Sequence, residues 1–242
     1  AAAYRKNGQP AEAKKVYDAI LGLKPEEKDA YFLRGSAELE LGDYESAKAD
    51  FDKAISMDPK NYDRLIEIYE ALADYGYREV GQEYLQNVLN TDKKLDAYDS
   101  GRIYYYLGDY QKAYLALEEA KGKGGVDSYL YLGKAYAATG DYNYASSVYS
   151  NYLSKQGPDA EIYNQLGLCE LAKKDYQKAL EAFQAGKQIE GNSLMQTLSF
   201  NEIVAYEYLQ DYQKAAVLLK AYLQNYPDDQ TAIREQQFLS TR

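Results

Sequence analysis

The sequence has no histidine, no tryptophan and a single cysteine among its 242 residues. Histidines and clustered cysteines supply many of the general bases, nucleophiles and metal ligands of proteins. Without them there is little from which to build a catalytic or metal site, so we expect a non-catalytic protein with no cofactor and no metal. One cysteine also excludes a disulfide within the chain, and this leaves the cellular compartment open.

Excess basic charge and long apolar runs are also missing. The chain carries 28 Lys and Arg against 38 Asp and Glu, a formal net charge of −10. Such a chain repels phosphate backbones, so nucleic acid is not an expected partner. No apolar run is long enough to cross a bilayer, so we expect no transmembrane segment.

What the chain does contain is a repeated motif, Asp-Tyr-x-x-Ala, in five copies. The copies begin at Asp43, Asp109, Asp141, Asp175 and Asp211. The motif alanines and two further small residues are spaced 34, 34, 32, 32, 34 and 36 residues apart: Ala13, Ala47, Gly81, Ala113, Ala145, Ala179 and Ala215. A period of this length indicates a solenoid, in which each unit buries its apolar face against its neighbours.

The most regular copy, residues 28–61, identifies the type of repeat. Its spaced residues are Tyr31, Gly35, Gly42-Asp43-Tyr44, Ala47, Phe51, Ala54 and Pro59. This pattern resembles the 34-residue tetratricopeptide repeat, and the resemblance extends over essentially the whole chain. It implies an all-α, right-handed solenoid of about seven helix-turn-helix units, with a concave groove that binds a peptide or a segment of a partner protein.

We interpret residues 1–242 as one repeat domain. Its expected units are approximately 1–27 (partial), 28–61, 62–93, 94–125, 126–159, 160–193 and 194–229, followed by a terminal cap helix at 230–242. The first unit lacks the start of its first helix, so we expect further residues upstream. The localisation is either cytoplasmic or, if a signal or lipoprotein leader was removed, the bacterial cell envelope or the exterior.

Two recurring residue types and the single cysteine have structural explanations. Each motif aspartate precedes a helical run, where its carboxylate can cap the helix. A glycine inside the first helix, as at Gly133, indicates a close contact between helices. Tyr69 and Ile203 replace that glycine in two units, where we expect a wider contact. Cys169 lies at a position where other units have small residues, so we interpret it as a buried apolar side chain.

Polar and aromatic residues of the first helices suggest where a partner binds. Asp63, Glu67, Glu70 and Asp74 share one helix face, which is either a solvated surface or an acidic stripe that faces a ligand. In the next unit Tyr105 and Tyr106 lie beside Arg102, a combination typical of binding hot spots, although packing against the next unit is the alternative.

The predicted groove collects these residues and the equivalent positions of other units. Its candidate residues are Phe32, Asp63, Glu67, Glu70, Asp74, Tyr98, Asp99, Arg102, Tyr105, Tyr106, Tyr131, Lys134, Asn164, Gln165, Phe200 and Asn201. Carboxylates beside aromatic rings suit a basic peptide with an apolar anchor. The alternative function is that of an architectural or self-associating spacer within a longer protein. The oligomeric state is not predicted.

Overall fold

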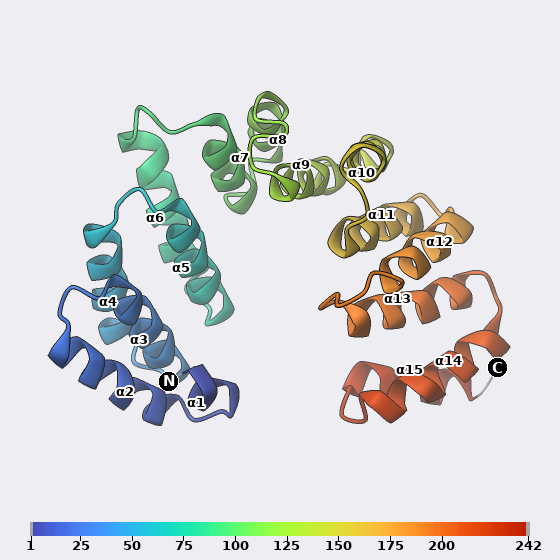
Figure 1. Ribbon diagram of the computed structural model, residues 1–242, viewed down its shortest axis with the longest axis horizontal. Helices are drawn as coiled ribbons and strands as arrows, with labels where there is room; N and C mark the ends of the chain where they lie inside the picture. Colours follow the sequence, from blue (N-terminus) through green and yellow to red (C-terminus); the bar gives the residue numbers. More distant parts are fainter. Residues whose placement is uncertain (1, 241–242) are drawn as a thin grey trace. The chain divides into compact units, whose positions relative to one another are not determined.

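The computed structural model describes residues 2–240, in which fifteen helices are joined by short turns (Figure 1). No strand occurs within this range. Residue 1 of the expected first unit and residues 241–242 of the expected cap lie outside the described residues. The chain divides into two compact units, Ala1–Gly108 and Asp109–Arg242. Their boundary falls between the two helices expected for residues 94–125, and the single repeat domain remains our interpretation.

The first unit contains seven helices that pack in sequence order. They are α1 (Ala2–Lys6), α2 (Pro10–Leu23), α3 (Lys28–Glu40), α4 (Tyr44–Met57), α5 (Tyr62–Asp74), α6 (Arg78–Thr91) and α7 (Ala97–Tyr106). Helices α3 and α4 form one hairpin and α5 and α6 form the next (Figure 1). The first helices α3, α5 and α7 also contact one another in that order, so their side chains form a continuous surface.

The second unit repeats the arrangement. Its helices are α8 (Tyr110–Glu119), α9 (Val126–Ala138), α10 (Tyr142–Gln156), α11 (Ala160–Ala172), α12 (Tyr176–Lys187), α13 (Met195–Tyr208), α14 (Tyr212–Asn225) and α15 (Gln230–Leu239). Each of these helices packs on the next one along the chain. The fold is therefore an all-α solenoid of helix-turn-helix hairpins. No helix among residues 2–240 combines the length and apolarity needed to cross a membrane.

The repeated aspartates start the second helix of their hairpins, as the sequence predicts. In α4, α8, α10, α12 and α14 the N-cap residue is the motif aspartate, and its carboxylate accepts a hydrogen bond from the backbone amide three residues later. Asp141 Oδ1, for example, lies 3.0 Å from the amide nitrogen of Tyr144. These carboxylates satisfy amides that have no partner within the helix.

The glycines of the first helices accommodate aromatic rings from the second helices. A Cβ atom added to Gly133 would lie 2.2 Å from Cζ of Tyr149, and one added to Gly167 would lie 2.3 Å from Cε1 of Phe183. Both rings are completely buried. The packing inside these two hairpins thus depends on the missing side chain, since no Cβ atom fits at these distances.

The third unit makes the same close contact between its two helices, but the glycine lies on the second helix and the aromatic residue on the first. Tyr69 of α5 stands where other units have glycine, but α6 supplies Gly81 opposite it, and a Cβ atom there would lie 3.2 Å from Cα of Tyr69. The expectation of a wider contact at Tyr69 is therefore wrong. In this unit the small residue is Gly81 of α6, and the backbones of α5 and α6 still approach closely.

Candidate functional site

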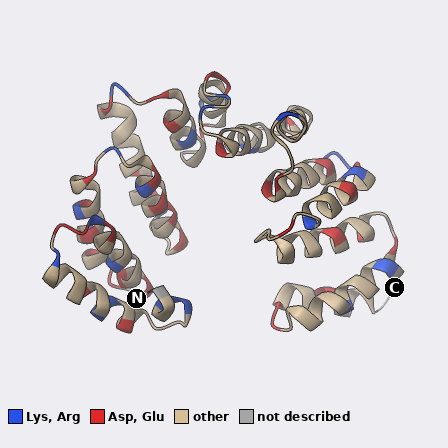
Figure 2. Cartoon of the chain, in the orientation of Figure 1, with Lys and Arg blue, Asp and Glu red and all other residues tan. Residues whose placement is uncertain are grey.

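In the first unit, ten of the predicted groove residues lie along α3, α5 and α7. We call this surface the α3–α5–α7 face. It comprises Asp29, Phe32, Asp63, Arg64, Glu67, Glu70, Asp74, Tyr98, Asp99, Arg102, Tyr105 and Tyr106. Figure 2 shows acidic residues along α5. Asp29 and Arg64 belong to this face although the sequence did not single them out, because both contact predicted residues.

Arg64 links the first two helices of this face. Its guanidinium carbon lies 4.0 Å from the centroid of the Phe32 ring on α3. Its Nη2 donates to Asp29 Oδ1 at 2.9 Å, and its Nη1 pairs with Glu67 Oε2 at 3.0 Å. A half-buried cation over an aromatic ring gains from the ring quadrupole as well as from its carboxylate partners.

Arg102 makes the corresponding link between α5 and α7. Its Nη1 donates to Asp63 Oδ1 at 2.5 Å and its Nη2 donates to Asp99 Oδ1 at 2.6 Å. The guanidinium lies over the Tyr98 ring, 4.5 Å from its centroid, and the residue is buried. Burial raises the pKa of Asp99, and the bond from Arg102 acts in the opposite direction. This side chain is therefore a fixed part of the face rather than a free cation.

The two neighbouring tyrosines of α7, Tyr105 and Tyr106, have different surroundings. The Tyr106 ring packs edge-on against Tyr69, with centroids 5.3 Å apart, and its hydroxyl donates to Glu70 Oε1 at 2.6 Å. Tyr105 packs edge-on against Tyr106 and is half-buried. Asp74 is exposed and forms no ion pair within the described residues. The predicted stripe and aromatic cluster therefore meet within one unit.

Pairing does not neutralise this face. Its six carboxylates, those of Asp29, Asp63, Glu67, Glu70, Asp74 and Asp99, stand against two guanidinium groups, those of Arg64 and Arg102. The excess is four negative charges. The side chains of Asp29, Asp63 and Glu67 are 56%, 75% and 50% exposed, so these carboxylates remain accessible despite their partners.

The remaining predicted residues lie in the second unit, on α9, α11 and α13. Lys134 pairs with Glu161 at 3.6 Å, and Gln165 donates to the same carboxylate at 2.8 Å. Asn201 Nδ2 donates to Asn164 Oδ1 at 2.9 Å, which joins α13 to α11. The last two residues are half-buried: Tyr131 lies on α9 and Phe200 packs against Tyr222 of α14. This set carries little net charge, unlike the α3–α5–α7 face.

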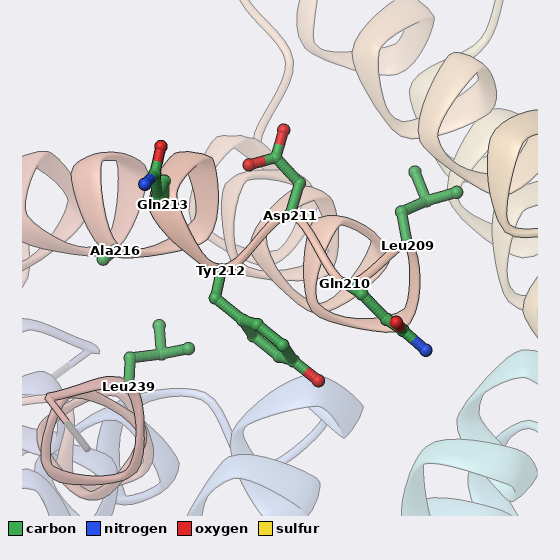
Figure 3. A pocket seen from close by; sticks show the side chains of 7 residues that line it. All are labelled: Leu209, Gln210, Asp211, Tyr212, Gln213, Ala216 and Leu239. Atoms are coloured by element: carbon green, nitrogen blue, oxygen red, sulfur yellow. The ribbon is translucent and has the colours of Figure 1, made fainter. Parts of the chain in front are cut away.

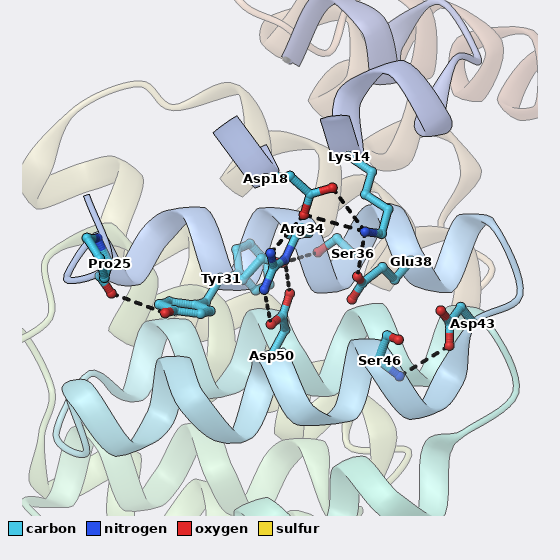
Figure 4. Close-up of polar contacts among 11 residues, drawn as sticks. Lys14, Asp18, Pro25, Tyr31, Arg34, Ser36, Glu38, Asp43, Ser46 and Asp50 are labelled. Carbon is cyan, nitrogen blue, oxygen red and sulfur yellow. Dashed lines mark hydrogen bonds and ion pairs between the residues drawn. The ribbon is translucent and has the colours of Figure 1, made fainter. Parts of the chain in front are cut away.

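A partly buried charged cluster between α2, α3 and α4 was not predicted (Figure 4). Arg34 forms two hydrogen bonds to Asp50, at 2.6 and 2.8 Å, and a third to Asp18. Glu38 is 3% exposed, its Oε1 lies 3.5 Å from Lys14 Nζ, and its Oε2 has no hydrogen-bond partner. Burial, with the charge of Asp50, raises the pKa of Glu38 to about 7.

This cluster has three carboxyl groups and only two cations, so protonation of Glu38 is the simplest way to balance it. Sequence spacing offered one signal for the cluster. Glu38 falls where Tyr104, Tyr136 and Tyr206 stand in other units, and a carboxyl group at a core position needs a partner.

Three further features bear on possible chemistry: metal ligands, the thiol of Cys169 and a surface pocket. Within the described residues no three His, Cys, Asp or Glu side chains converge to hold a metal ion. Cys169 is buried, and burial raises the pKa of its thiol to about 12. A pocket of about 630 Å³ with a mixed polar and apolar lining lies beside the α13–α14 turn, between Leu209, Tyr212 and Leu239 (Figure 3). Asp211 is its one ionisable carboxylate, and it already caps α14.

Comparison with known proteins places this architecture in a family. A tetratricopeptide repeat family model matches residues 1–62 and 130–193, and a second one matches residues 200–229. The chain belongs to the tetratricopeptide repeat family. This assignment agrees with the Gly-Asp-Tyr turns and the glycine–aromatic contacts described above. Members of this family are typically non-catalytic scaffolds for protein–protein interaction.

Solved structures of other tetratricopeptide repeat proteins share the fold. The APC/C hetero-tetramer Cut9–Hcn1 matches with a TM-score of 0.58 and 18% identity over 98% of this chain and 47% of its own. A tetratricopeptide repeat protein from Parabacteroides merdae matches with a TM-score of 0.57 and 16% identity over 84% and 80%. YrrB, described as having an unusual peptide-binding site, matches with a TM-score of 0.51 and 18% identity over 93% and 100%.

This tetratricopeptide repeat chain thus spans about half the length of the matched Cut9–Hcn1 chain. No curated protein matched the sequence. These three structural matches are each below 20% identity, so they establish the fold and leave the partner to be argued from the surface itself.

Proposed function

We propose that this tetratricopeptide repeat protein is a non-catalytic scaffold whose α3–α5–α7 face binds a basic segment of a partner protein. The observation that carries the proposal is the excess of four negative charges on this face, with several carboxylates exposed beside aromatic rings. Family membership supports a protein partner, and the solved structure of YrrB is an example of a peptide-binding member.

The aromatic residues favour a segment that also carries an apolar side chain. Tyr105 is half-buried beside Tyr106, so its ring retains area that a partner can cover. Tyrosine contributes strongly to binding hot spots because it offers a large rigid surface. Exposed carboxylates, in contrast, mainly increase the association rate and the dependence on salt. The same negative charge disfavours nucleic acid as a ligand.

A calorimetric titration against a peptide library can test this proposal. The library pairs Lys or Arg with Leu or Phe at varied spacing, and binding is measured at low and high salt. Asp74→Lys alters the charge without breaking an ion pair among the described residues, and we expect it to weaken binding mainly at low salt. Tyr105→Ala should weaken binding at both salt concentrations by ~1–2 kcal/mol.

Glu119→Lys is the matched control, because Glu119 is exposed on α8 in the other unit. It makes the same charge change away from the α3–α5–α7 face and should leave affinity unaltered. If Asp74→Lys and Tyr105→Ala bind every captured peptide as tightly as wild type while their melting is unchanged, this face is not the binding site. Equal weakening by Glu119→Lys would point to net charge alone.

A further inference from the structure

The ring of Phe32 and two carboxylates form a subsite for a guanidinium group on the α3–α5–α7 face. The group that fills this subsite belongs to Arg64 of the same chain. Its guanidinium carbon lies 4.0 Å from the centroid of the Phe32 ring, its Nη2 donates to Asp29 Oδ1 at 2.9 Å, and its Nη1 lies 3.0 Å from Glu67 Oε2. A ring face with two flanking carboxylates suits a planar guanidinium better than a compact ammonium group. The subsite is therefore suited to arginine.

The same combination occurs one unit further along the chain. Arg102 lies over the Tyr98 ring and donates to Asp63 and Asp99. Its side chain is only 8% exposed, and a paired charge that is buried is costly to release. Two subsites of one composition thus hold a guanidinium group on this face, and the second of them is firmly filled.

The Arg64 subsite differs because a partner can reach it. The Arg64 side chain is 19% exposed, and both of its carboxylate partners, Asp29 and Glu67, are exposed. Ion pairs between such accessible groups contribute little to stability, so another guanidinium group can replace Arg64 at little cost. The Phe32 ring packs against the buried Phe51 ring, with centroids 6.1 Å apart, so it keeps its position when Arg64 leaves.

We propose that the partner segment carries an arginine that takes the place of Arg64 over the Phe32 ring. Arg64 is then an internal competitor that lowers the affinity for the partner. The proposal rests on the proposed function, which assigns a basic segment to this face, and it specifies arginine rather than lysine. The released Arg64 side chain extends into water, while the incoming arginine restores the contacts with Asp29 and Glu67.

Calorimetric titration of the whole chain with two peptides of the library, identical except for Arg or Lys at the basic position, tests the displacement. Arg64→Gln should bind the arginine peptide ~5-fold or more tightly than wild type, the factor expected if Arg64 fills the subsite about four fifths of the time. The lysine peptide should not gain this factor, because an ammonium group cannot lie flat over the ring between two carboxylates.

Lys24→Gln is the matched control. It removes one positive charge from an exposed position at the end of α2, outside the α3–α5–α7 face. The change in net charge is the same as in Arg64→Gln. We therefore expect Lys24→Gln to alter the affinity for both peptides equally, and by less than Arg64→Gln alters the affinity for the arginine peptide.

Ethylguanidinium, a fragment of the arginine side chain, tests the subsite without any peptide. Arg64→Ala empties the subsite, so ethylguanidinium should shift the NMR signals of the Phe32 ring in a saturable manner. Ethylammonium at the same ionic strength should not do so. Wild type should show smaller shifts with ethylguanidinium, because Arg64 already fills the subsite.

Failure of the displacement is distinguishable from failure of the proposed function. If the arginine peptide binds wild type but gains no more from Arg64→Gln than from Lys24→Gln, the displacement is overturned and the proposed function stands. If no peptide binds either protein, the proposed function fails. Ethylguanidinium then decides the subsite: saturable Phe32 shifts in Arg64→Ala support it, and their absence overturns it.

A measurement on wild type covers the case in which the Arg64 variants do not fold. Binding of the arginine peptide should shift the Nε–H signal of Arg64, because its guanidinium leaves the Phe32 ring. The signal of the buried Arg102 should stay in place. An unchanged Arg64 signal in the saturated complex overturns the displacement.

Discussion

The Tyr106 hydroxyl on α7 donates a hydrogen bond of 2.6 Å to Glu70 Oε1 on α5. The two residues are 36 positions apart, close to one repeat period, so the bond joins the first helices of consecutive hairpins. It also supplies a carboxylate of the α3–α5–α7 face with a donor that is not a cation. The negative charge of Glu70 is therefore oriented but not neutralised.

Tyr106→Phe should lower the free energy of unfolding by about 1 kcal/mol, because it removes this hydrogen bond and keeps the ring that packs on Tyr69. Urea denaturation followed by circular dichroism measures the change. Tyr75→Phe is a suitable control, since Tyr75 is 47% exposed at the end of α5. Equal losses in both variants would show that the bond contributes nothing specific.

Gly133→Ala should destabilise the chain by about 1–3 kcal/mol, because the new Cβ would overlap the buried Tyr149 ring. Gly133→Leu should be more harmful still. Gly22→Ala tests the same exchange where nothing lies within 4 Å of the added atom. That variant should melt at the wild-type temperature or above it, since alanine favours a helix more than glycine does. A wild-type melting temperature for Gly133→Ala would contradict the close contact.

Stability should decrease as the pH rises from about 4.5 to 7, in part because of Glu38. Its pKa is about 7 in the fold and near 4.5 when unfolded, so the folded chain binds more protons in this range. The loss from this group is at most about 3 kcal/mol. Glu38→Gln should flatten the dependence of unfolding free energy on pH in the first unit. Retention of the full slope would show that Glu38 is ionised throughout.

Asp141→Ala should cost about 1 kcal/mol of stability, because the carboxylate caps α10. Asp141→Asn retains an oxygen that can accept the same bond and should remain close to wild type. Thermal melting of the three proteins distinguishes the two cases. If the asparagine variant loses as much as the alanine variant, the charge of Asp141 matters more than the cap.

The helices and their caps could be predicted from the sequence because their causes are local. Asp141 and Asp211 precede helical runs at a fixed distance from the motif alanine, and a cap requires only such neighbours. The contact between Tyr69 and Gly81 was harder to predict. It is recognised only when both helices of the hairpin are considered together, because the glycine lies on α6 and not on α5.

The charged contacts depend on tertiary structure and were predicted in part. Spacing placed Glu67 and Glu70 on one face, but it did not assign Arg64 to Phe32 or Arg102 to Asp63. The cluster around Glu38 was not predicted at all. A glutamate within an amphipathic helix looks solvated until the neighbouring helices that bury it are known.

The buried thiol of Cys169 allows local opening of the hairpin that contains α11 to be measured by thiol labelling. As the one cysteine in the chain, it gives any thiol reagent a single point of attack, and the raised pKa keeps it unreactive while α11 stays packed. The rate of labelling therefore measures how often that hairpin opens. A tightly held partner near α11 would slow this labelling without any engineered probe.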